Sequence, residues 1–136
     1  MIGVTADTNI YISALEFGGQ PLEILKAARR GLIRPDISPP LLDEIHRVLR
    51  DKFLWSEDRL QRLAFRLSHF TSLVHPASRI NAVPEDPDDN RVLECAVEAK
   101  SLFIVTGDTA LLRLGEYGGV PILRVADFIS QLGLGT

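Results

Sequence analysis

The stretch Leu102-Phe103-Ile104-Val105-Thr106 decides the fold class of this chain. It is apolar up to its last residue and rich in β-branched side chains, which predicts a short strand buried on both faces. Strands of this kind are typical of parallel sheets that helices cover on both sides. A second such strand, residues 2–6, begins the chain. We therefore predict an α/β fold, a three-layer α/β/α sandwich with a central parallel sheet.

Segments with helical periodicity alternate with the predicted strands. Proline, serine and aspartate residues mark the starts of the helices. The predicted strands are residues 2–6, 34–38, 72–75, 102–106 and 121–125. The predicted helices are residues 10–15, 21–31, 39–51, 86–100 and 126–132, with another that begins at residue 56. A loop is expected over residues 76–85. The alternation runs through residues 1–136 without a repeat or a linker, so we expect a single domain.

The composition is that of a globular protein, with 46% hydrophobic and 24% charged residues. A net charge of −3 argues mildly against a nucleic-acid partner, although the basic residues gather in the first two thirds of the chain. A single cysteine excludes a disulfide within the chain and fits a reducing compartment. Neither a signal peptide nor a membrane-spanning apolar run is visible, so we predict a cytoplasmic protein with no membrane partner.

Two aspartates follow directly on predicted strands. Asp7 comes after the strand of residues 2–6, and Asp108 comes after the strand of residues 102–106. Sheets of this class place their sites at the carboxyl ends of the strands, near the point where the strand order reverses. We therefore expect both carboxylates at the functional edge of the sheet.

Two further acids lie on predicted helices and are expected to face the sheet. At about 100° per residue, Asp89 falls within the apolar stripe of its helix, while Glu94 and Glu98 fall opposite. Glu44 sits at the edge of the apolar stripe of the helix over residues 39–51, roughly 40° from Val48. The stripe that includes Asp89 consists of Val92, Leu93, Ala96 and Val97.

Four half-buried carboxylates in one place raise an electrostatic problem. They repel one another, and burial disfavours their charged forms, so either several are protonated or a cation neutralises them. An all-oxygen acidic pocket suits Mg²⁺ or Mn²⁺. One or two such ions would polarise a phosphodiester and generate hydroxide for in-line attack. The sequence therefore points to metal-dependent phosphodiester hydrolysis.

Each acid also has an ordinary structural explanation. Asp86 could be the N-cap of the helix that it begins, with Asp89 as the capping-box acid. Asp7 and Asp108 could belong to plain turns or helix caps, and a lone Glu44 would usually be a surface residue. The functional interpretation rests on the coincidence of four acids placed toward one end of one sheet.

Taken in order, the motifs resemble those of the PIN-domain family, and in particular the VapC-like toxins of prokaryotic toxin–antitoxin systems. The motifs are Val4-Thr-Ala-Asp7-Thr8-Asn9, Ser38-Pro-Pro-Leu-Leu-Asp-Glu44, Asp86-Pro-Asp-Asp89-Asn90 and Ile104-Val-Thr106-Gly-Asp108. The resemblance implies a central sheet with the strand order 3-2-1-4-5. It also implies an endoribonuclease that cleaves single-stranded RNA by two-metal-type hydrolysis with Mg²⁺ or Mn²⁺, leaving 5′-phosphate and 3′-hydroxyl ends.

The resemblance also implies roles for particular residues and partners. The residues that match the metal-binding and catalytic acids of the family are Asp7, Glu44, Asp89 and Asp108. The residues that match, or lie close to, the polar groups around those acids are Asn9, Ser38, Asp86 and Thr106. Either Asp86 or Asp88 could share the metal contact. Besides RNA, the implied partners are a cognate antitoxin and a second copy of the chain.

Arg59, Arg62 and Arg66 share one face of the helix that begins at residue 56. This face is either simply solvated or contacts RNA phosphates or an acidic partner. Trp55 could stack on a base, although packing at a helix junction or at a subunit contact is its ordinary interpretation. The alternative function is a non-catalytic PIN-like module that binds RNA or protein. A haloacid-dehalogenase-like phosphatase is disfavoured, because it needs a second acid where this chain has Asn9.

Overall fold

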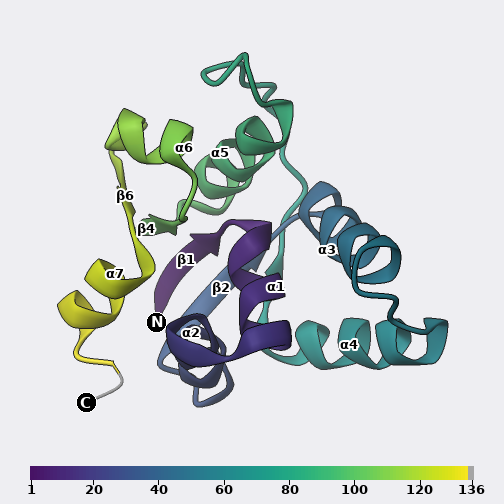
Figure 1. The fold of residues 1–136 in the computed structure, drawn as a ribbon. Coiled ribbons are helices and arrows are strands. Elements are labelled where there is room, and N and C mark those ends of the chain that lie inside the picture. The colour runs from purple at the N-terminus through teal and green to yellow at the C-terminus, as the bar shows by residue number, and fades with distance from the viewer. Residues whose placement is uncertain (135–136) are drawn as a thin grey trace.

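The computed structural model describes residues 1–134, which form a sheet flanked by helices (Figure 1). The strands are β1 (Ile2–Ala6), β2 (Ile33–Ile37), β3 (Ser72–Leu73), β4 (Phe103–Val105), β5 (Glu116–Tyr117) and β6 (Val120–Leu123). The helices are α1 (Thr8–Phe17), α2 (Gly19–Arg29), α3 (Pro39–Asp51), α4 (Glu57–Phe70), α5 (Pro87–Ala99), α6 (Thr109–Leu114) and α7 (Val125–Leu132). The alternation of strand and helix confirms the predicted α/β class.

The sheet has the strand order β3-β2-β1-β4-β6-β5. The first five strands in this order are parallel and correspond to the five predicted strands, so the predicted order 3-2-1-4-5 is confirmed for them. One further strand was not predicted: β5 lies at one edge of the sheet and pairs antiparallel with β6. Gly118 and Gly119 connect these two strands with positive φ angles of 56° and 83°, which glycine adopts without steric cost. The sheet is therefore mixed.

Helices cover the sheet and complete the core. Helix α5 packs against the neighbouring strands β1, β2 and β4, and α2 packs against β2, α1 and α7. Cys95 on α5 is fully buried, as expected for a small core residue. Helices α6 and α7 flank β6 at the other end of the sheet (Figure 1).

Several burial predictions for α5 and β4 are wrong. Glu94 is only 5% exposed and Val97 is 38% exposed, which is the reverse of the helical-wheel prediction. The reason is that the loop before α5 lies on this helix and covers Glu94, whose carboxylate accepts a hydrogen bond from Ile80 N and pairs with Arg91. Leu102 is 56% exposed and precedes β4, so the strand is shorter than predicted.

Two of the helices differ from the prediction because an aspartate caps them. Helix α1 begins at Thr8, where Asp7 accepts a hydrogen bond from Asn9 N. Helix α6 was not predicted, and Asp108 accepts hydrogen bonds from two of its N–H groups. Short helices carry too little apolar periodicity to stand out in a sequence.

Within residues 1–134, no helix combines the length and the apolar character that crossing a membrane requires.

Candidate metal centre

The site lies at the point where the strand order of the sheet reverses, between the parallel strands β1 and β4. Ala6 and Val105 are register partners in these two strands, and Asp7 N donates to Val105 O at 2.9 Å. The next residue of each strand, Asp7 or Thr106, therefore lies at the carboxyl edge beside the other. This is the position where sheets of this class bind ligands.

Hydrogen bonds connect Glu44 on α3, Asp7 directly after β1 and Asp108 directly before α6. Thr106 Oγ1 donates to Asp7 Oδ2 at 2.7 Å and accepts from Asp108 N at 2.9 Å. On the other side, the Thr8 hydroxyl lies 3.3 Å from Asp7 Oδ1 and 3.0 Å from Glu44 Oε2. Because a hydroxyl carries one hydrogen, Thr8 donates to one of the two carboxylates at a time. The fold thus spaces Glu44, Asp7 and Asp108 along one edge.

A tighter cluster forms where α5 meets α6. Asp86, Asp89 and Asp108 each place a carboxylate oxygen within 4.8 Å of the other two. Asp86 and Asp108 are the N-caps of α5 and α6, and Asp89 lies in the first turn of α5. Asp89 is only 5% exposed, and its Oδ2 atom is buried without a hydrogen-bond partner. A buried unpaired oxygen costs about 1–3 kcal/mol, and either a bound cation or a proton shared with a neighbouring carboxylate would remove that cost.

Burial and mutual repulsion shift the proton affinities of these acids. Desolvation is the main cause of the raised pKa of Asp89. A hydrogen bond that the protonated acid shares with the Asp108 side chain adds to it, as do the nearby charges of Asp108, Asp86 and Asp7. Desolvation also raises the pKa of Asp7, against the hydrogen bond from Thr106, and raises the pKa of Glu44. Within residues 1–134 no recorded ion pair involves any of these carboxylates. A cation would relieve the repulsion.

The donor set fits a small divalent cation. All the groups are carboxylate oxygens, which Mg²⁺ and Mn²⁺ prefer. Opposite ligands of Mg²⁺ lie about 4.2 Å apart, since each bond is about 2.1 Å long. The 4.8 Å span of Asp86, Asp89 and Asp108 is compatible with this spacing after small side-chain adjustments. Asp7 and Glu44 lie outside that cluster and would have to approach the ion through rotation or water.

The sequence analysis also predicted polar residues around the acids, and in the structure only some of them contact the acids through their side chains. Thr106 is fully buried and touches both Asp7 and Asp108. Asn9 is exposed, and its recorded contact with Asp7 runs through its backbone N–H. Ser38 is fully buried, and its side chain lies next to the Cys95 thiol. The roles assigned to Asn9 and Ser38 stay predictions.

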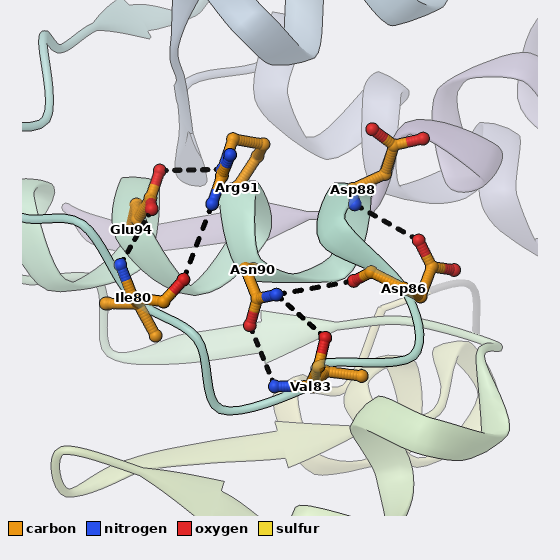
Figure 2. Close-up of polar contacts among 7 residues, drawn as sticks. All are labelled: Ile80, Val83, Asp86, Asp88, Asn90, Arg91 and Glu94. Carbon is orange, nitrogen blue, oxygen red and sulfur yellow. Dashed lines mark hydrogen bonds and ion pairs between the residues drawn. The ribbon is translucent and has the colours of Figure 1, made fainter.

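The sequence analysis did not identify two residues that position the acids or the loop next to them. Thr8 links Glu44 to Asp7, although nothing in the sequence distinguishes it from an ordinary helix-start threonine. Asn90 receives a hydrogen bond from Val83 N at 2.8 Å and donates to Val83 O at 2.8 Å (Figure 2). Its signal was its place directly after Asp89, on the buried side of α5.

The arginines of α4 lie on a different part of the molecule. A groove with a volume of about 1000 Å³ runs between α2 and α4. Its cationic lining residues are Lys26, Arg29, Arg59, Arg62 and Arg66. The Arg59 guanidinium stacks 3.6 Å from the centre of the Trp55 ring, which is buried. The prediction that Trp55 packs at a helix junction is confirmed.

These features define an α/β protein with a candidate metal centre at the point where the strand order of its sheet reverses. Comparison of the sequence with protein-family models identifies the family, because the model of the PIN domain matches residues 4–110. The chain belongs to the PIN domain family.

A solved structure supports the same fold. The structure of VapBC2 from Rickettsia felis, bound to a DNA fragment from their promoter, contains a chain that is similar with a TM-score of 0.65 and 16% sequence identity. The similarity covers 90% of the present chain and 98% of that chain. Comparison with curated proteins gives no match.

Proposed function

We propose that this protein is a metal-dependent endoribonuclease that cleaves single-stranded RNA, with residues 1–136 acting as one catalytic unit in the cytoplasm. The observation that carries the proposal is the cluster of Asp86, Asp89 and Asp108 with the buried, unpaired Oδ2 of Asp89. Membership of the PIN domain family supports it, since the resemblance implies nuclease activity.

The acids of the site would hold Mg²⁺ or Mn²⁺. A bound ion would supply Lewis acidity toward a phosphodiester and would activate water as the nucleophile. Hydrogen bonds from Thr106 and Thr8 keep the carboxylates of Asp7 and Glu44 at the same edge of the sheet as the cluster. Burial of Asp89 keeps bulk water away from one side of the site.

Two arginines lie in a recess next to the site. Arg47 and Arg50 line this open recess of about 440 Å³ together with the acids Asp43, Glu44 and Asp88. Guanidinium groups beside an acidic edge provide phosphate contacts that position a strand without reading its bases. We assign RNA contact to these residues rather than to Arg59, Arg62 and Arg66, which line the groove between α2 and α4.

The experiment is a cleavage assay on matched single-stranded RNA, double-stranded RNA and single-stranded DNA, with Mn²⁺, Mg²⁺ or a chelator. We expect cleavage of the single-stranded RNA with either metal, none with the chelator, and 5′-phosphate ends on the products. The alternative, a non-catalytic module that binds RNA or protein, predicts RNA retention in a gel-shift assay with no cleavage under any of these conditions.

We further propose that the protein is the toxin of a toxin–antitoxin pair and that an acidic, amphipathic helix of the antitoxin occupies the groove between α2 and α4. The groove combines five cationic side chains with apolar residues that include Leu22, Leu25 and Phe70. Phe65, another lining residue, is 57% exposed, which is unusual for a phenylalanine. The similar fold within the VapBC2 complex supports a protein partner. The implied homodimer stays a prediction.

Charge reversal in the groove tests this partner. We expect Arg62→Glu to weaken binding to the product of an adjacent small reading frame at least about 10-fold, because it places an acid opposite the acidic partner. Arg113→Glu, on the exposed side of α6, is the matched control and should bind normally. Unchanged antitoxin binding with weakened RNA binding would instead make the groove an RNA surface and overturn the assignment.

A further inference from the structure

We propose that Arg124, at the end of β6, binds a backbone phosphate of the RNA on the opposite side of the site from Arg47 and Arg50. This inference rests on the proposed ribonuclease function and goes beyond it, because it adds a substrate-binding residue outside the acidic cluster. It also gives the path of the RNA strand, which crosses the carboxyl edge of the sheet from the recess beside α3 to the start of α7 (Figure 1).

Arg124 lies at the same level of the sheet as the residues of the candidate metal centre. Val105 and Leu123 are register partners in β4 and β6, and Thr106 N donates to Leu123 O at 3.0 Å. The next residue of each strand, Thr106 or Arg124, therefore lies beside the other, as Asp7 lies beside Thr106. Because neighbouring strands are about 4.8 Å apart, the Cα atom of Arg124 lies about 5 Å from that of Thr106 and about 10 Å from that of Asp7.

The Arg124 side chain is available to a ligand, while its backbone is fixed. The Arg124 carbonyl oxygen accepts a hydrogen bond from Phe128 N at 3.0 Å, in the first turn of α7. The side chain is exposed, and within residues 1–134 no ion pair of its guanidinium is recorded. The fold therefore holds the Cα atom in place and leaves the positive charge without a carboxylate partner.

The start of α7 does not explain an arginine at this position. Arg124 is the N-cap of α7, and no side-chain hydrogen bond caps this helix. Serine, threonine, asparagine and aspartate are preferred there because they accept hydrogen bonds from the first N–H groups, whereas a guanidinium only donates. The helix dipole also disfavours a positive charge at this end. A residue that costs helix stability in this way is expected where it serves a functional site.

The charge of Arg124 complements a phosphate chain that crosses an acidic edge. The neighbouring site is formed by carboxylates, including those of Asp7 and Asp108. Such an edge repels a phosphate unless cations lie beside it. Arg47 and Arg50 provide these cations on the side of α3, and Arg124 provides one on the side of β6. A guanidinium can donate two parallel hydrogen bonds to one phosphate, which holds the strand at a defined place.

The test is the binding of single-stranded RNA by the full chain, measured by fluorescence anisotropy in Ca²⁺ at several salt concentrations. We expect Arg124→Gln to weaken binding about 10-fold and to reduce the slope of log affinity against log salt concentration by about 0.7, the value for one phosphate contact on a single strand. Arg124→Lys keeps the charge and should keep the slope. Arg30→Gln removes an equal exposed charge at the opposite edge of the sheet, just before β2, and should bind like the unaltered protein.

The outcomes separate this inference from the proposed function. If the unaltered protein binds the RNA and Arg124→Gln shows the same affinity and salt slope, the inference is wrong while the function stands. If the unaltered protein neither binds nor cleaves single-stranded RNA, both are wrong. An equal loss in Arg30→Gln would mean that net charge sets the affinity, which also overturns the inference.

Mn²⁺ binding, measured by titration calorimetry, checks that the metal centre is undisturbed. Arg124→Gln should bind Mn²⁺ at least as tightly as the unaltered protein, because the substitution removes a nearby cation and no carboxylate. Weaker Mn²⁺ binding would assign the loss of RNA affinity to the metal centre and contradict the inference.

Discussion

Asp108→Asn is expected to reduce RNA cleavage at least about 100-fold while leaving the fold intact, because the variant loses a charge that would hold the metal at the reacting phosphate. Both helix N–H groups that Asp108 caps are bound by its Oδ1 atom. An asparagine oxygen can accept the same two hydrogen bonds, so α6 keeps its cap. Cleavage rates under single-turnover conditions, with circular dichroism spectra of both proteins, measure the two parts of this prediction.

Asp7→Asn should lose cleavage to a similar extent. Both of its carboxylate oxygens accept hydrogen bonds, from Thr106 and from Asn9 N, so asparagine forfeits one of them. That loss costs about 1 kcal/mol and does not unfold a domain of this size. Asp127→Asn, at an exposed position on α7, is the control for lost charge. Wild-type rates in either site variant would show that the assignment of these acids is mistaken.

Asp89→Asn should stabilise the metal-free protein and weaken its binding of Mn²⁺. In the metal-free protein at about pH 8, we expect it to raise the free energy of unfolding by about 1–3 kcal/mol, since it removes a buried charge and places an amide donor beside Asp108. In saturating Mn²⁺ the ranking should reverse, because only the unaltered protein gains the stabilisation of a bound ion. Thermal melts with and without Mn²⁺ measure both effects.

The pH dependence of this difference follows from the raised pKa of Asp89. The folded protein holds the proton of this acid more tightly than the unfolded chain does. Burial of Asp89 therefore does not lower the free energy of unfolding of the unaltered protein below pH 3.8, the ordinary pKa of the group. The free energy of unfolding falls as the pH rises from there through the raised pKa of the folded protein. The advantage of Asp89→Asn should vanish near about pH 4 and be complete in alkaline solution. An advantage that stays constant across this range would mean that burial of the charge is not its cause.

The fold was largely predictable because its determinants are local. The apolar runs around Val4 and Ile104 specify buried strands, and the helical spacing on α3 specifies its buried face. The antiparallel edge of β5 was not predictable, because it depends on two glycines closing a turn and on only two residues of strand.

The candidate site was predictable only in outline. The placement of Asp7 and Asp108 after strands indicated a shared edge, and the phase of α5 indicated that Asp89 is buried. The same wheel misplaced Glu94, because a loop that covers a helix leaves no periodic signal in the sequence. For the same reason, the sequence could not decide between the capping and the metal-binding interpretation of Asp86, which the cluster geometry makes compatible.

A crystal structure of the protein soaked in Mn²⁺, with the metal located by its anomalous scattering, tests the central claim most directly. The expected result is a peak about 2.1 Å from carboxylate oxygens of Asp89 and Asp108, close to Asp86. The contradictory result is a well-ordered site at saturating Mn²⁺ with no peak among these three side chains.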